Sequence, residues 1–120
     1  MLLNLLVIRA RDVDALGRFY SSLGMTFLRE RHGAGPEHLA CSMGGTTIEL
    51  YPSEGSIPPP MRLGFRVDDV SSSFTEALAR GAQSVSSPRM SQWGERAVIR
   101  DPEGNTVELL RPAERELHAA

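Results

Sequence analysis

The chain has 120 residues, of which 41% are hydrophobic and 23% charged, and its formal net charge is −2. This composition is typical of a soluble globular domain and argues against disorder, and the small negative charge gives no attraction for nucleic acid or anionic membrane surfaces. Every basic residue apart from the histidines is an arginine, so no lysine is present to form a Schiff base. A lone cysteine, Cys41, excludes an intramolecular disulfide and favours the cytoplasm.

The first half of the chain begins with an apolar run at residues 2–10, which predicts a buried strand. The run is too short for a membrane span, and it has no basic segment before it, as a signal peptide would. Asp12 is expected to cap a helix that ends at Gly24. Three further strands are predicted at 25–31, 38–43 and 46–51, and the proline-rich residues 54–60 predict a linker.

The second half repeats this order. A strand is predicted at 63–68, Asp69 is expected to cap a helix that ends at Gly81, and later strands are predicted around Val85, at 97–100 and at 106–110, with a tight turn at 101–105. Along the chain, Asp69 follows Asp12 by the same number of residues as Gly81 follows Gly24, which indicates an internal repeat. The sequence therefore predicts an α+β fold: one domain over 1–120, with βαβββ modules at 1–53 and 61–113 and a tail at 114–120.

Several motifs in this order resemble a known family. They are the helix from Asp12 to Gly24 with its Phe-Tyr pair, the segment 65–70 (FRVDDV), the pair 93–94 (WG), and the turn 101–105 (DPEGN) followed by Glu108. Together they resemble the vicinal oxygen chelate superfamily, which includes glyoxalases, extradiol dioxygenases and bleomycin resistance proteins. The resemblance implies two curved sheets around a small-molecule cavity, and a homodimer.

The metal enzymes of that family bind their ion through two histidines and two glutamates. The resemblance places the glutamates at Glu49 and Glu108, but it places the histidines at Leu5 and Arg62. Leucine has no lone pair to donate, and arginine carries a permanent positive charge that repels a divalent ion. We therefore expect no metal at these positions, with Arg62 replacing the metal charge and pairing with Glu49 or Glu108.

Candidate ligand-binding residues come from the alternation of side chains along the strands. Arg9 lies on the same face as Leu5, Arg66 on the same face as Arg62, and Tyr51 on the same face as Glu49. Three arginines on one concave surface would suit a carboxylate or phosphate group. The alternative is that Arg9 and Arg66 pair with acidic residues at a strand end or subunit boundary.

The remaining aromatic, histidine and cysteine residues have simpler interpretations. Trp93 could stack on a planar ligand, although packing over the rim of the sheet is the more common role. His32 and His38 are expected at the surface, since with Cys41 they do not form the spacing of a zinc site. Cys41 is expected to be an unreactive core thiol.

These observations favour a binding protein over an enzyme. The predicted function is metal-independent and cofactor-independent binding of a small organic molecule in a cavity of a homodimer, and the arginines would suit an anionic one. The alternative is a metal-dependent lyase or dioxygenase of the same superfamily that uses other ligands.

Overall fold

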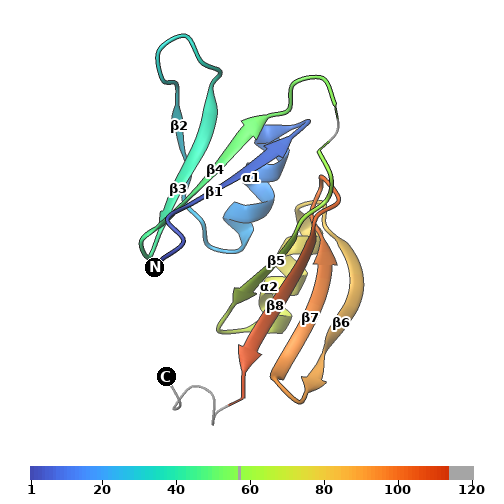
Figure 1. Ribbon diagram of the computed structural model, residues 1–120. Coiled ribbons are helices and arrows are strands. Elements are labelled where there is room, and N and C mark those ends of the chain that lie inside the picture. Colours follow the sequence, from blue (N-terminus) through green and yellow to red (C-terminus); the bar gives the residue numbers. More distant parts are fainter. Residues whose placement is uncertain (57, 114–120) are drawn as a thin grey trace. The chain divides into compact units, whose positions relative to one another are not determined.

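The computed structural model describes residues 1–56 and 58–113 of the chain. It divides into two compact units, Met1–Pro59 and Pro60–Ala120, each with its own sheet and helix (Figure 1). The predicted tail at 114–120 lies outside the described residues.

The first unit is a four-stranded sheet with one helix. Its elements in chain order are β1 (Leu5–Ala10), α1 (Val13–Ser22), β2 (Leu28–Glu30), β3 (His38–Met43) and β4 (Thr46–Pro52). The strands lie in the order β1-β4-β3-β2, with β1 parallel to β4 and the other pairs antiparallel. Strands β1 and β4 come first and last in the module along the chain, but they are neighbours in the sheet.

The second unit has the same topology. Its elements are β5 (Arg62–Arg66), α2 (Val70–Ala79), β6 (Gln83–Ser91), β7 (Gly94–Arg100) and β8 (Thr106–Pro112), with strand order β5-β8-β7-β6. Strands β5 and β8 are parallel, as β1 and β4 are. The predicted α+β fold with two βαβββ modules is confirmed.

Equivalent residues begin and end the two helices. The Asp12 carboxylate accepts a hydrogen bond from the Ala15 N–H at 2.9 Å, and Asp69 accepts one from the Ser72 N–H at 3.0 Å. Gly24 and Gly81 follow the helices with φ of 105° and 96°, where a side chain would be strained. The caps and stops predicted from the repeat are therefore present in both units.

Each helix covers one face of its own sheet (Figure 1). Helix α1 buries Leu16, Phe19 and Tyr20 against a sheet face that includes Ile8 and Leu50. In the second unit the corresponding core consists of residues from α2, β7 and β8: Val70, Ala77, Ala97, Ile99, Val107 and Leu109. The opposite face of each sheet, which its own helix does not cover, is called the uncovered face below.

The strand predictions were least accurate in the edge strands. Strand β2 covers only Leu28–Glu30 of the predicted 25–31, and β6 runs over Gln83–Ser91 where only the vicinity of Val85 was expected. The pairing of β6 with β7 shifts register between Ser84 and Arg89. A strand at the edge of a sheet tolerates proline and irregular register because one side of it makes no ladder bonds, so Ser-rich β6, which contains Pro88, lacks the alternation that marks a central strand.

Candidate functional site

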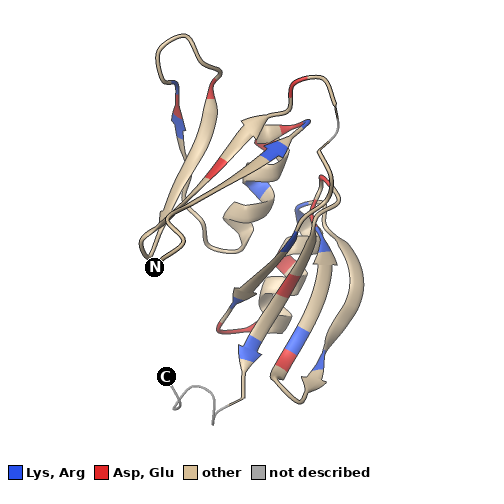
Figure 2. Cartoon of the chain, in the orientation of Figure 1, with Lys and Arg blue, Asp and Glu red and all other residues tan. Residues whose placement is uncertain are grey.

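The uncovered face of the second unit carries most of the predicted site residues. In the strand register Gly64 lies opposite Glu108, and Glu108 lies opposite Val98, so side chains on β5, β8 and β7 share this face. Arg62 and Arg66 flank Gly64 on the same side of β5. Arginine positions lie on both of the strands that flank β8, namely β5 and β7 (Figure 2).

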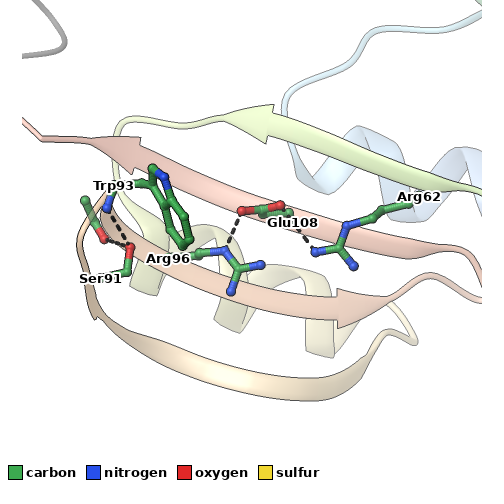
Figure 3. A network of polar contacts seen from close by, with 6 residues as sticks. Arg62, Ser91, Trp93, Arg96 and Glu108 are labelled. Carbon is green, nitrogen blue, oxygen red and sulfur yellow. Dashed lines mark hydrogen bonds and ion pairs between the residues drawn. The ribbon is translucent and has the colours of Figure 1, made fainter.

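Glu108 forms an ion-pair network with two arginines (Figure 3). The Arg96 Nε–H donates to Glu108 Oε1 in a close contact, and an Arg62 guanidinium nitrogen lies 3.4 Å from Oε2. The hydrogen bond from Arg96 lowers the pKa of the Glu108 carboxyl; burial opposes this change, and the charges of Arg96 and Arg62 lower the pKa further. Glu108 is therefore ionised at neutral pH and is poorly suited to act as a general acid.

Arg62 pairs with Glu108, which is one of the two partners expected for it. Arg96 is a site residue that the sequence reasoning missed. The predicted strand began at Ala97, whereas β7 begins at Gly94, and this difference left Arg96 outside the sheet. Extending the strand back by alternation from Val98 would have placed Arg96 on the same face as Glu108.

Arg66 lines a pocket on the uncovered face. The pocket has a volume of about 310 Å³ and is lined by Gly64, Phe65, Arg66, Glu108 and Leu110. Among the residues that the structure describes, no acidic side chain forms an ion pair with Arg66. The pocket thus combines apolar surface and the paired Glu108 with a guanidinium that has no carboxylate partner in the described chain.

Trp93 lies in the turn between β6 and β7, at one end of this face. Its backbone N–H donates to the Ser91 hydroxyl at 3.1 Å, and its carbonyl accepts from the Ala113 N–H at 3.0 Å, so the turn is fixed by hydrogen bonds. Its side chain projects to the same side of the sheet as Arg96 and Glu108 (Figure 3). Trp93 keeps 51% of its surface exposed, and it is available for contact with a ligand.

In the first unit, Arg9 and Tyr51 are neighbours on the uncovered face. They are partners in the parallel β1–β4 register, and the Arg9 guanidinium lies over the Tyr51 ring at 5.3 Å from its centroid. Arg9 also lines a pocket of about 310 Å³ with Ser53, Glu54, Ser56 and Pro58. None of the ion pairs among residues 1–56 and 58–113 involves Arg9.

The prediction that His38 is a surface residue was wrong. His38 is completely buried, and its ring stacks on Tyr51 with centroids 4.1 Å apart and planes 10° from parallel. Its position at the start of β3 places it between strands β2 and β4, where neighbouring side chains cover it. His32, in the loop after β2, is exposed as expected, and Cys41 is buried.

Glu49 has neighbours that the sequence reasoning did not consider. Its Oε2 lies 3.5 Å from the buried His38 Nε2, and Glu30 and His32 complete a group of potential metal ligands in the first unit. The only sequence signal was the placement of His38 and Glu49 on adjacent strands, because the spacing along the chain fits no common zinc motif.

The inherited metal positions do not fit a metal ion. Leu5 is 47% exposed and pairs with Thr47, two residues before Glu49, while Arg62 pairs with Thr106, two residues before Glu108. Only Glu49 and Glu108 carry lone pairs for a cation, and Glu108 already holds Arg96 and Arg62. These four positions therefore lack the donor set of the family's metal enzymes.

Comparison with known families decides the relationship. The family model described as a glyoxalase-like domain matches residues 5–110, which is nearly the whole chain. The chain belongs to the glyoxalase-like domain family. The resemblance to the vicinal oxygen chelate superfamily, inferred from the motifs, is confirmed.

Solved structures of this glyoxalase-like fold are similar over nearly their full length. TnmS3, an antibiotic binding protein from Streptomyces sp. CB03234, is 25% identical with a TM-score of 0.75, and the match covers 94% of this chain and 97% of that one. A glyoxalase/bleomycin resistance protein/dioxygenase family enzyme from Burkholderia phytofirmans PsJN is 23% identical with a TM-score of 0.72, covering 92% and 98%. A glyoxalase/bleomycin resistance protein from Streptomyces sp. CB03234 is 25% identical with a TM-score of 0.68, covering 91% and 99%. No curated protein sequence matches significantly.

Neither α1 nor α2, nor any other helical stretch of the described residues, has the length and apolar character needed to cross a membrane.

Proposed function

We propose that this glyoxalase-like protein binds a small organic molecule with an anionic group, and that binding uses no metal at the four inherited positions. The observation that carries the proposal is Arg66, a guanidinium without a carboxylate partner in the described chain, at the wall of a pocket whose one acid, Glu108, is already paired with Arg62 and Arg96. Guanidinium groups bind carboxylates and phosphates through paired hydrogen bonds, and Leu110 offers apolar contact to the rest of a ligand. The similar fold of an antibiotic binding protein is consistent with this proposal.

Other candidate residues have distinct proposed roles. Trp93, half-exposed near the end of the same sheet face, would contact a planar part of the ligand. Arg62 and Glu108 form an ion pair on this face, which fixes the positions of their two charges. In the first unit, Arg9 and Tyr51 offer a second cationic and aromatic surface, and Glu49 lies two residues before Tyr51 on the same face. The proposed location is the cytoplasm, where the single thiol of Cys41 would stay reduced.

The test uses a pair of fluorescent probes that differ in charge. Anilinonaphthalene sulfonate is anionic and phenylnaphthylamine is its neutral analogue, so an arginine-dependent site should distinguish them. A charge-assisted hydrogen bond contributes about 1.5–3 kcal/mol, and solvent screening reduces this for an exposed guanidinium, so Arg66→Gln should weaken sulfonate binding about tenfold. Binding of the neutral probe should change little.

The control for this substitution is Arg80→Gln, which removes the same charge at the exposed end of α2. Arg80→Gln should leave both probes unaffected. Equal losses in the two variants, or no loss in either, would show that the pocket around Arg66 is not an anion site. Native mass spectrometry of the purified protein would then identify any ligand that it retains.

We also propose that the protein is a homodimer. Large apolar side chains remain exposed in both units: Leu2, Leu3, Leu5, Leu28, Val85 and Met90. A two-fold pairing of like modules would cover such surface and protect the sheet edges. Light scattering at micromolar concentration should give twice the mass of one chain, and a monomer under these conditions would contradict the proposal.

A metal-dependent lyase or dioxygenase is the second candidate function. The observation that favours it is the group formed by Glu30, His32, His38 and Glu49, in which all but Glu49 are ligands other than the inherited ones. Whether this group binds a metal can be tested without knowing any substrate.

A further inference from the structure

A group of two histidines and two glutamates converges on the uncovered face of the first unit. Glu30 is the last residue of β2, His38 is the first residue of β3 and its direct cross-strand partner, and Glu49 lies on β4. His32 is in the loop that follows β2. One potential ligand atom from each residue lies within 4.8 Å of all the others.

Three of the distances between these atoms are close to those of ligands around one ion. His38 Nε2 lies 3.4 Å from Glu30 Oε1 and 3.5 Å from Glu49 Oε2, and His32 Nε2 lies 3.4 Å from the same Glu30 oxygen. Good hydrogen bonds between such groups are shorter, at about 2.7–2.9 Å. Ligand atoms that surround a tetrahedral ion at bond lengths of about 2.1 Å lie roughly 3.4 Å apart.

The buried His38 is oriented as a metal ligand would be. Its Nδ1 lies 3.3 Å from the Pro36 carbonyl oxygen, which can only accept, so in a hydrogen bond between them Nδ1 is the donor. In the neutral ring Nε2 then has the free lone pair, and metal-binding histidines are commonly held by a bond from the other ring nitrogen to a backbone carbonyl. Stacking on Tyr51 fixes the ring plane.

The Tyr51 hydroxyl lies 3.4 Å from the same Nε2, but the rings are nearly parallel. The Nε2 lone pair points along the plane of the imidazole ring. The phenol oxygen lies over the ring and therefore outside this plane. His38 Nε2 faces the carboxylates of Glu30 and Glu49, so either a proton or a metal ion has to lie between the nitrogen and these oxygens. No arginine among the described residues forms an ion pair with Glu30 or Glu49.

We infer that Glu30, His32, His38 and Glu49 form a site for a divalent transition metal ion, and zinc is the ion used to test it. Two imidazole nitrogens with two carboxylate oxygens suit zinc, manganese, iron(II) or cobalt, whereas magnesium and calcium prefer oxygen ligands alone. Three of the four ligands differ from the family's inherited positions. The inference does not depend on the small-molecule proposal, and it departs from the expectation of a metal-free protein because that expectation rested on the inherited positions and on the spacing of His32 and His38 along the chain.

The experiment uses full-length protein without a histidine tag, stripped with a chelator and then titrated with zinc by calorimetry. We expect one zinc per chain, a higher melting temperature with zinc, and no comparable shift with magnesium, because binding to the native state alone stabilises it. Cobalt should give the visible absorption of a tetrahedral site. These readouts report the metal itself and are independent of any probe in the Arg66 pocket.

Two variants separate ligation from folding. His32→Gln changes an exposed loop residue, so it should fold normally and weaken zinc binding at least tenfold. Glu30→Gln, at the end of an edge strand, should do the same. His118→Gln removes the remaining histidine of the chain, and it should leave zinc affinity unchanged.

Two results would overturn the inference. The first is zinc binding that is absent in the parent protein, with histidine NMR showing that His38 is an imidazolium that bridges the two glutamates. The second is zinc binding that survives unchanged in both His32→Gln and Glu30→Gln, which would place the metal elsewhere.

Discussion

Replacing Asp101 by alanine is expected to destabilise the protein by about 3 kcal/mol. The side chain is almost fully buried, and its two oxygens accept three hydrogen bonds, from the N–H groups of Glu103 and Asn105 and from the Asn105 amide, at 2.9–3.0 Å. Asn105 in turn accepts a hydrogen bond from the Met61 N–H at 2.8 Å, next to the start of β5. An unsatisfied buried donor costs about 1–3 kcal/mol, and alanine would leave several of them.

The sole tryptophan, Trp93, belongs to the second unit, so its fluorescence during urea unfolding reports this change directly. Asp101→Asn keeps one acceptor oxygen, and we expect an intermediate loss of stability. Glu76→Ala removes a carboxylate from the exposed side of α2, and it should cost no more than about 0.5 kcal/mol. If Asp101→Ala cost as little as Glu76→Ala, the hydrogen-bond network in the 101–105 turn would not be important for stability.

Replacing Gly94 by alanine is expected to have a comparable or larger effect, about 3–5 kcal/mol. The added Cβ would lie 2.1 Å from the Arg111 carbonyl oxygen and 2.7 Å from the Ala113 nitrogen. Both are backbone atoms of the neighbouring strand end, and Ala113 is held there by its hydrogen bond to Trp93. Gly94 also has a φ of 128°, which a side chain rarely adopts, so relief of the clash requires the β7–β8 pairing to open.

Two other glycines of the same unit separate the clash from the strain. Gly104 has a φ of 90° but open space around it, so Gly104→Ala should show the conformational cost alone, about 1–2 kcal/mol. Gly64 has neither feature, and Gly64→Ala should be nearly neutral. Urea unfolding of the three variants should therefore rank Gly94 well above Gly104, and Gly104 above Gly64. A different order would mean that the β7–β8 end can move to accommodate a side chain.

The family motifs in the second half have structural roles in this chain. Side chains of the 101–105 turn accept hydrogen bonds from the backbone of the turn itself and from the N–H next to the start of β5. Gly94 of the 93–94 pair lies beside the end of β8, where any side chain would clash. Recognition of these motifs identified the fold correctly, and the histidine group of the first unit lies on other residues. The pocket and the arginine network do include motif residues, since Arg66 belongs to the segment 65–70 and Glu108 follows the 101–105 turn.

The sequence by itself determined the repeated βαβββ order, the helix caps at Asp12 and Asp69 and the central strands, since these depend on local patterns of apolar residues, glycine and aspartate. It also determined that the inherited metal positions lack two of their ligands. Only the tertiary structure decided which side chains meet, because strand register joins residues far apart in sequence. Arg96 reaches Glu108, and His38 lies buried between Glu30 and Glu49, through pairings across strands that no spacing along the chain encodes.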